Sequence, residues 1–271
     1  MKKAAAAAAV QHHPAVVDQR HAPNDTSHHH HHHKSTRSKL PEFSEFSEFV
    51  NEQYIDEQIF KHPFTCMMAG PSKSGKTSLL RQILEYQSII FDEPPQRIIY
   101  CYSRWQPDIF NNLKQQHPDI LEFNQGLPDI DEINSDIRNL VILDDLMKEC
   151  GKDQSIADIF TVDSHHKNIS VFFLSQNLFA NSKFSRTISL NCNYIIILNN
   201  PRDRAQIFYL ARQMFPENPQ FLLDCYRDAV EQKQYGYLLL DFTQTTPNEF
   251  RVSTNIIPSP DLPQRIIYQQ K

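Results

Sequence analysis

The chain has 271 residues, of which 40% are hydrophobic and 22% charged, a composition typical of a globular protein with one sizeable domain. Its longest apolar runs have the length of a strand, as in residues 194–198, so we expect no membrane-spanning helix. Five dispersed cysteines without a C-x-x-C pair argue against a disulfide framework and a zinc site, and they favour reduced thiols inside a cell.

The net charge of −5 is unevenly distributed along the chain. Residues 1–40 hold six of the 27 Lys and Arg residues and two of the 32 Asp and Glu residues, so the remainder carries 21 basic and 30 acidic residues. Nucleic-acid backbones are bound chiefly through Lys and Arg, which displace counterions. The acidic remainder therefore argues against extensive DNA contact and would confine it to a local patch, such as one that lines a ring.

Residues 1–41 are expected to form a disordered, low-complexity tail. They combine a run of six alanines with His28–His33 and show no apolar periodicity. The alanine run is too short and too weakly hydrophobic for a secretory signal, and the histidines are better explained as an expression tag or a repeat than as a metal site. We interpret residues 42–60 as a linker or helical lead-in and residues 61–271 as the folded domain.

Beyond the tail, strand and helix patterns alternate. Apolar runs predict strands at 64–69, 97–102, 140–143, 169–175 and 194–198, and helical patterns cover 76–87, 107–116, 153–163, 203–213 and 217–231. Residues 237–242 and 250–257 are typical of a terminal β-hairpin. Strands separated by helices predict an α/β fold with a mostly parallel, buried central sheet.

The strongest motif is Gly-Pro-Ser-Lys-Ser-Gly-Lys-Thr at residues 70–77, which fits G-x-x-x-x-G-K-[ST] at every fixed position. It follows an apolar strand and opens an amphipathic helix, as a phosphate loop requires. Lys76 would place a cation near the β- and γ-phosphates of ATP, and the Thr77 hydroxyl would reach Mg²⁺. The expected nucleotide-binding residues are Gly70, Pro71, Ser72, Lys73, Ser74, Gly75, Lys76, Thr77 and Ser78.

Two carboxylates follow the apolar strand at 140–143. Asp144 would hold Mg²⁺, directly or through water, and Asp145 would polarise the water that attacks the γ-phosphate. Many related ATPases carry Glu at the second position, so Asp145 has a shorter reach than the usual residue. Another acid, such as Glu149, is the alternative for positioning the water. Alternatively, Asp144 and Asp145 have only a structural role, as acidic residues that cap the end of a strand.

The apolar strand at 169–175 ends in the amide pair Gln176-Asn177. An amide can hydrogen-bond both the γ-phosphate and the attacking water, which makes Gln176 a candidate γ-phosphate sensor. The alternative is an ordinary loop that begins with Gln and Asn. In either case, the pair is expected at the carboxyl edge of the sheet, where α/β folds present their ligand-binding residues.

Arginines follow the strand at 194–198. Charge that develops on the γ-phosphate requires a cation, often an arginine from a neighbouring subunit. Arg204 and Arg202 are the candidates at this strand end, and Arg186 is a third. For each of the three, a solvated surface charge is an equally good explanation.

These motifs, in this order, resemble the FtsK/HerA superfamily of DNA-pumping ATPases. More narrowly, they resemble the genome-packaging ATPases of Polinton/Maverick elements and of related double-stranded DNA viruses and virophages. The similar stretches are residues 100–107, 164–170, 173–179, 199–203 and 250–268. The resemblance implies a P-loop NTPase fold of the ASCE/RecA-like type, with three layers and the Gln176 strand between the phosphate-loop strand and the Asp144 strand.

The resemblance also implies a function: an ATP- and Mg²⁺-dependent translocase that packages double-stranded DNA into a capsid. Such a protein would form a homo-oligomeric ring with ATP between subunits, Arg202 or Arg204 as the trans-acting finger, and DNA in the centre. It would contact a capsid protein and no membrane, in a virion or in the host nucleus or cytoplasm. Basic candidates for the DNA channel are His165, His166, Lys167 and Lys183.

Two other functions fit the same motifs. The chain could be a helicase or another replication or recombination motor, although it carries no added nuclease or zinc module. It could also be a nucleotide-binding switch that does not hydrolyse ATP. The presence of all the hydrolytic residue types argues against the switch.

Overall fold

The described strands form one mixed sheet. The computed structural model describes residues 36–37, 58–160, 164–178, 183–257 and 265–271. Their order across the sheet is β1-β10-β9-β8-β7-β2-β6-β5-β3-β4. The strands are β1 (Thr36–Arg37), β2 (Thr65–Ala69), β3 (Arg97–Tyr102), β4 (Leu121–Gln125), β5 (Asn139–Asp144), β6 (Ile169–Ser175), β7 (Tyr194–Leu198), β8 (Tyr237–Asp241), β9 (Val252–Thr254) and β10 (Ile266–Ile267).

The sheet has two halves of different strand direction. Strands β7, β2, β6, β5, β3 and β4 are parallel neighbours, and we call them the parallel half. Strands β8, β9, β10 and β1 pair antiparallel beyond β7 and form the antiparallel half. Because β6 lies between β2 and β5, the segments that follow these three strands emerge side by side at one edge.

Helices connect most of the strands. They are α2 (Lys76–Glu85), α3 (Gln87–Ile90), α4 (Pro107–Gln116), α5 (Met147–Cys150), α6 (Gln154–Asp158), α7 (Ser164–Lys167), α8 (Lys183–Asn191), α9 (Ala205–Met214) and α10 (Pro219–Glu231). Pro107 and Pro219 stand at the first helical position, where the fixed φ of proline suits a helix start. None of the helices in the described segments is long and apolar enough to cross a membrane.

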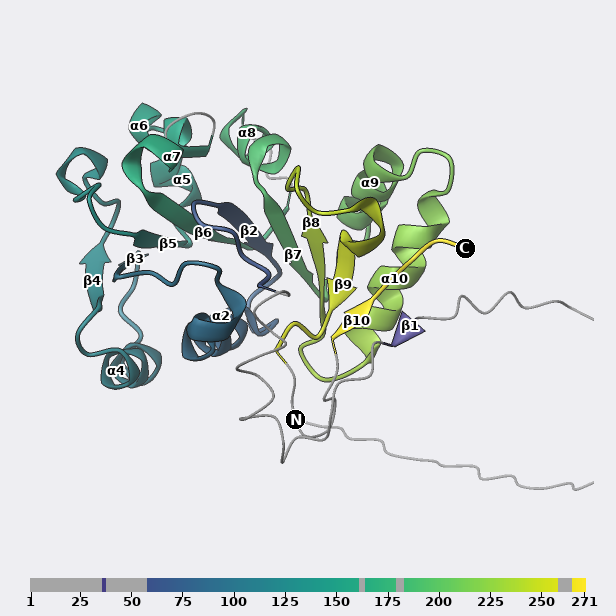
Figure 1. Cartoon of the computed structure of the whole chain (residues 1–271), viewed down its shortest axis with the longest axis horizontal. Helices are drawn as coiled ribbons and strands as arrows, with labels where there is room; N and C mark the ends of the chain where they lie inside the picture. Colours follow the sequence, from purple (N-terminus) through teal and green to yellow (C-terminus); the bar gives the residue numbers. More distant parts are fainter. Residues whose placement is uncertain (1–35, 38–57, 161–163, 179–182, 258–264) are drawn as a thin grey trace, which may run out of the picture. The chain divides into compact units, whose positions relative to one another are not determined.

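The sheet is the middle of three layers. Side chains alternate along β2, so Met67 and Ala69 enter one core while Cys66 and Met68 enter the other. Helices α2, α3 and α4 contribute to the second core, and α5, α6, α8, α9 and α10 to the first. Figure 1 shows α2 and α4 on one side of the central strands and α5 and α6 on the other. Burial on both faces explains the apolar runs of β6 (residues 171–174) and β7 (residues 194–198).

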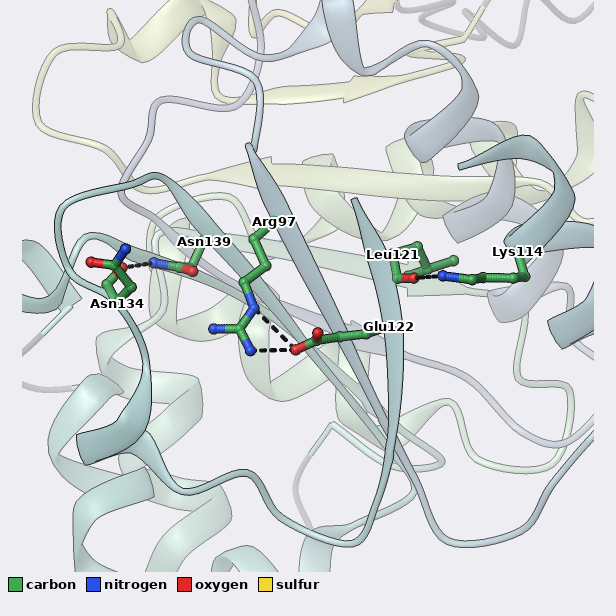
Figure 2. Close-up of polar contacts among 6 residues, drawn as sticks. All are labelled: Arg97, Lys114, Leu121, Glu122, Asn134 and Asn139. Atoms are coloured by element: carbon green, nitrogen blue, oxygen red, sulfur yellow. Dashed lines mark hydrogen bonds and ion pairs between the residues drawn. The ribbon is translucent and has the colours of Figure 1, made fainter. Parts of the chain in front are cut away.

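The outer strand of the parallel half is fastened by polar contacts (Figure 2). Arg97 of β3 donates from Nε to Glu122 Oε1 of β4 at 3.0 Å. Lys114 of α4 donates to the carbonyl of Leu121. Charged side chains on a short strand of this kind discourage further strand pairing at the sheet edge.

The predicted fold class is confirmed: three layers, a mostly parallel sheet in the strand order of a P-loop NTPase, and an antiparallel β8–β9 pair near the carboxyl terminus. The strands at 97–102, 169–175 and 194–198 and the helix at 107–116 have the predicted bounds. β4 and α8 were not predicted. β4 alternates only weakly because it is an edge strand, and α8 is rich in Ser, Thr and Asn, which are weak helix formers.

The predicted tail and lead-in lie mostly outside the described residues. Within the predicted tail, Thr36–Arg37 form β1 and pair with β10. The packed core already includes Ile59 and Phe60, and the Phe60 ring stacks on Phe64 with centroids 5.1 Å apart. The boundaries at residues 41 and 60 therefore remain predictions, with ordered packing from Ile59 onward.

Candidate active site

The phosphate loop connects β2 to α2 and depends on both of its glycines. Gly75 has a φ of 100°, which lies in the left-handed region that disfavours other residues. A Cβ on Gly75 would lie 2.7 Å from Tyr235 Cβ. A Cβ on Gly70 would lie 2.5 Å from Ser74 Oγ and 3.0 Å from Leu198 Cβ. The sharp curl of the loop and its close neighbours therefore both require glycine.

Lys76 folds back over the loop. Its Nζ donates to the carbonyl oxygens of Gly70 and Pro71, the latter at 2.9 Å. Partial burial lowers the pKa of Lys76, whereas the charges of Asp144 and Asp145 raise it. The ammonium is thus held against the backbone of the loop, within the electrostatic influence of both acids.

The loop offers further hydrogen-bond donors. The amino end of α2 has no side-chain cap, so its first N–H groups lack the partner that a capping side chain would supply. The buried Ser74 Oγ has no hydrogen-bond partner in the described structure. Unpaired donors at a helix amino end attract anions, since the helix dipole adds partial positive charge there. This geometry fits the phosphates of a nucleotide.

Asp144 ends β5 and is held by a tyrosine from the neighbouring strand. The Tyr100 hydroxyl, on β3, donates to Asp144 Oδ2 at 2.6 Å. Burial raises the pKa of Asp144, and the Tyr100 hydrogen bond and the Lys76 charge act in the opposite direction. Tyr100 is fully buried, so it fixes the orientation of the carboxylate from within the core.

Asp145 lies in a different environment from Asp144. Its φ is 55°, and its N–H donates to the carbonyl of Leu174 at 3.3 Å. The side chain is exposed. The left-handed turn therefore directs successive carboxylates to different surroundings, one half-buried against Tyr100 and one in solvent.

Gln176 follows β6 and is exposed at the same sheet edge. The next residue is tied to α9, because Gln206 Nε2 donates to Asn177 Oδ1 at 3.3 Å and to Asp203 Oδ2 at 2.9 Å. Gln206 Oε1 also accepts from the N–H of Leu178 at 2.6 Å. Any displacement of the segment after β6 would thus be transmitted to the start of α9.

Arg202 and Arg204 lie in the connection from β7 to α9, and both are exposed. The connection is shaped by Asn200, whose Oδ1 accepts from the N–H groups of Arg202 and Asp203, each at 3.2 Å. Arg186 is also exposed but belongs to α8. The structure therefore brings Arg202 and Arg204 to the end of the strand next to the phosphate loop, and leaves Arg186 on a helix that precedes this strand.

The donors expected for Mg²⁺ are the Thr77 hydroxyl and the Asp144 carboxylate. Both are hard oxygen donors, and Mg²⁺ commonly takes one or two protein carboxylates together with water and substrate phosphates. Among the residues that the structure describes, no group of three or more His, Cys, Asp or Glu side chains could hold a metal. The chemistry of Thr77 and Asp144 fits a Mg²⁺ ion whose remaining ligands are water and substrate phosphates.

Three of the four basic candidates for a DNA channel lie away from the phosphate loop. His165, His166 and Lys167 belong to α7, which precedes β6 and so lies at the opposite edge from the phosphate loop. Lys167 Nζ pairs with Asp131 Oδ1 at 2.9 Å, which partly neutralises its charge. The side chains of His165 and Lys183 lie outside the described part of the structure. A cavity of about 750 Å³ also lies away from the loop, bordered by Cys192, Phe242 and Tyr268 among others.

No family model matches the sequence, and no curated protein matches it. Solved structures with a similar fold include the DNA-packaging ATPase B204 of Sulfolobus turreted icosahedral virus. That match has 12% sequence identity and a TM-score of 0.45, and it covers 68% of this chain and 95% of that one. The genome-packaging NTPase B204 of Sulfolobus turreted icosahedral virus 2, in complex with ATP-γS, has 13% identity and a TM-score of 0.40, with 71% and 96% covered.

A KaiC-like protein from Pyrococcus horikoshii has 12% identity and a TM-score of 0.40, with 87% of this chain and 99% of that one covered. All three TM-scores are below 0.5, so the functions in these names are not transferred to this chain. The residues and their geometry carry the functional argument.

Sequence reasoning missed three contributors to this region. Tyr100 was noted only within a similar stretch, and its contact with Asp144 depends on the pairing of β3 with β5. Gln206 and Tyr235 belong to no motif and reach the site from segments more than a hundred residues downstream of the phosphate loop. Neither residue stands out in the sequence from other glutamines and tyrosines of the chain.

Proposed function

We propose that this chain is a Mg²⁺-dependent ATPase. The observation that carries the proposal is the position of β6 between β2 and β5, which brings the Lys76 loop, Gln176 and Asp144 to one edge of the sheet. The electrostatic influence of Asp144 and Asp145 on Lys76 supports the same grouping. A chance glycine turn would not be expected to combine these three features.

Each residue has a distinct role in the proposed reaction. The loop N–H groups and Lys76 bind the phosphates, and Thr77 and Asp144 hold Mg²⁺, which would neutralise charge on the β- and γ-phosphates. Asp145 accepts a proton from the attacking water, and its exposed carboxylate is free to do so. Gln176 orients the water and senses the γ-phosphate. Arg202 or Arg204 supplies the last positive charge to the active site of a neighbouring subunit.

We further propose that hydrolysis drives translocation of double-stranded DNA into a capsid by a homo-oligomeric ring. Five sequence stretches resemble FtsK/HerA-type packaging ATPases, and the Polinton/Maverick type in particular. This resemblance supports a function in DNA packaging. The link from Asn177 through Gln206 to Asp203 supports a coupled motor, because it connects the γ-phosphate side of the site to the arginine segment. Such a protein would act in a virion or in a host compartment that contains DNA.

The test is ATP turnover by the purified protein, with and without double-stranded DNA. Lys76→Ala and Asp145→Asn should each reduce turnover by at least about a hundredfold, since each removes a group that acts on the transferred phosphoryl group or the water. Lys152→Ala and Asp119→Asn, at exposed positions outside the site, are the matched controls and should leave turnover unchanged.

Stimulation by duplex DNA in particular would support translocation, whereas stimulation by single-stranded DNA with strand separation would favour a helicase. Nucleotide binding without turnover under every condition would contradict the ATPase and leave a nucleotide-dependent switch.

A further inference from the structure

Tyr235 lies against the phosphate loop from the antiparallel half of the sheet. It belongs to the connection between α10 and β8, and β8 begins opposite the carboxyl end of β7, where Tyr237 pairs with Leu198. A Cβ placed on Gly75 would be 2.7 Å from Tyr235 Cβ and 2.9 Å from its Cγ. The Tyr235 residue is nevertheless 51% exposed. One part of this side chain therefore contacts the loop while much of its surface remains open.

The backbone on both sides of Tyr235 is held in place. Tyr235 itself has a φ of 61°, an uncommon conformation for a non-glycine residue. The N–H of Gly236 donates to Lys233 O at 3.1 Å, and a Cβ on Gly236 would lie 2.4 Å from Ala229 O. Lys233 Nζ in turn donates to Asn255 Oδ1 at 2.9 Å. The turn is thus pressed against α10 and tied to the segment after β9, which fixes the position from which the ring projects.

The order of the strands orients a bound nucleotide. Asp144 and Gln176, the residues assigned to the metal and the γ-phosphate, follow β5 and β6 on one side of β2. Tyr235 precedes β8 on the other side of β2, beyond β7. A nucleoside triphosphate with its γ-phosphate toward Asp144 and Gln176 and its phosphates at the amino end of α2 would therefore extend its base toward β7 and β8.

We propose that Tyr235 is the stacking platform for the base of the nucleotide, a role that rests on the ATPase function proposed above. An exposed aromatic ring beside a phosphate loop can stack on a base, and such stacking tolerates any base because every base has a π-face. Larger purines bury more area than pyrimidines. This contact therefore favours purine over pyrimidine nucleoside triphosphates and discriminates only weakly between adenine and guanine.

The test measures Kd by calorimetry for Mg²⁺-ATP, Mg²⁺-GTP, Mg²⁺-CTP and inorganic tripolyphosphate. Tyr235→Phe keeps the ring, and Tyr235→Asn removes it while retaining a residue that tolerates a positive φ. Tyr209→Ala removes an exposed tyrosine on α9 and is the matched control. Tripolyphosphate reports the phosphate loop without the base.

Tyr235→Asn should weaken ATP and GTP binding by roughly tenfold, CTP binding by less, and tripolyphosphate binding not at all. Tyr235→Phe and Tyr209→Ala should bind all four ligands like the unaltered protein. Unchanged ATP affinity in Tyr235→Asn would overturn the stacking role and leave the proposed ATPase intact. Equal weakening of ATP and tripolyphosphate would also overturn it, because Tyr235 would then act only by supporting the loop. Failure of the unaltered protein to bind ATP would instead contradict the proposed function itself.

Discussion

The two halves of the sheet contribute to the site residues that differ in how far the sequence reveals them. In the parallel half, the Lys76 loop, Asp144 and Gln176 each follow a buried apolar strand, so sequence motifs identify them. The antiparallel half has no comparable motif, yet the connection between α10 and β8 places Tyr235 against Gly75. Local motifs thus identify the residues to which we assign phosphate chemistry, whereas the pairing of the strands determines which other residues contact them. The antiparallel half is therefore part of the site's architecture and more than an extension of the sheet.

The largest expected effects test whether the two halves unfold together. Phe172→Ala in β6 should lower the free energy of unfolding by about 3–5 kcal/mol, because the buried ring packs with Phe60, Phe64 and Phe91. Leu239→Ala in β8 should lower it by about 2–5 kcal/mol, since this side chain joins the same core. Urea unfolding followed by circular dichroism and by fluorescence measures both changes.

Both variants should show a single transition, because one hydrophobic core spans the halves. A separate early transition in Leu239→Ala alone would show that the antiparallel half is an independently unfolding unit.

The next prediction concerns the contact between the halves. Gly75→Ala should weaken ATP binding by more than about tenfold and destabilise the protein by about 2 kcal/mol, because the new Cβ combines an unfavourable φ with a collision at Tyr235. Gly126→Ala is the matched control: its φ is 77°, but nothing lies within 4 Å of its added Cβ. It should show only the backbone penalty of about 1 kcal/mol and normal ATP affinity.

A double-mutant cycle sharpens this prediction. Tyr235→Gly removes the Cβ with which the new methyl group collides, so the stability loss from Gly75→Ala should be smaller in the Tyr235→Gly background. Additive losses would mean that the φ of Gly75 alone accounts for the effect and that the two residues are not coupled.

Much of the parallel half could be predicted from the sequence because burial on both faces leaves continuous apolar runs, as in residues 194–198. The site residues in this half could be predicted because each follows such a run. The contact of Tyr100 with Asp144 could not, since it requires the register of β3 on β5. Tyr235 and Gln206 could not, since nothing local distinguishes them from exposed residues such as Tyr209. Tertiary proximity, and not residue type, gives them their importance.

Tyr100→Phe tests a tertiary contact inside the parallel half. Loss of the hydroxyl should raise the pKa of Asp144 further, because burial already raises it and the Tyr100 hydrogen bond opposes that rise. In the proposed ATPase, Asp144 must be ionised to hold Mg²⁺, so activity should be present above its pKa and lost as pH falls through it. The acidic limb of the turnover profile should therefore move to higher pH, with a loss of roughly tenfold or less near neutrality. Tyr102→Phe, on the same strand, is the control, and an identical profile in both variants would contradict the assignment.

The smallest effect is expected at Gln206, which ties the segment after β6 to α9. Gln206→Ala removes its hydrogen bonds with Leu178, Asn177 and Asp203. The free energy of unfolding should fall by only about 1 kcal/mol, since these bonds are partly exposed. ATP affinity should be unchanged, because Gln206 contacts neither the loop nor Tyr235 in the described structure, whereas kcat and its stimulation by DNA should fall several-fold.

Gln213→Ala, an exposed glutamine on the same helix, controls for the loss of a side chain from α9. A fall in ATP affinity with unchanged kcat would place Gln206 in nucleotide binding instead of in the coupling between Gln176 and the arginine segment. A fall in kcat without any loss of DNA stimulation would limit its role to positioning Gln176. Only a joint loss of kcat and of DNA stimulation fits the proposed coupling, in which Gln206 transmits changes at the γ-phosphate from the segment after β6 to α9.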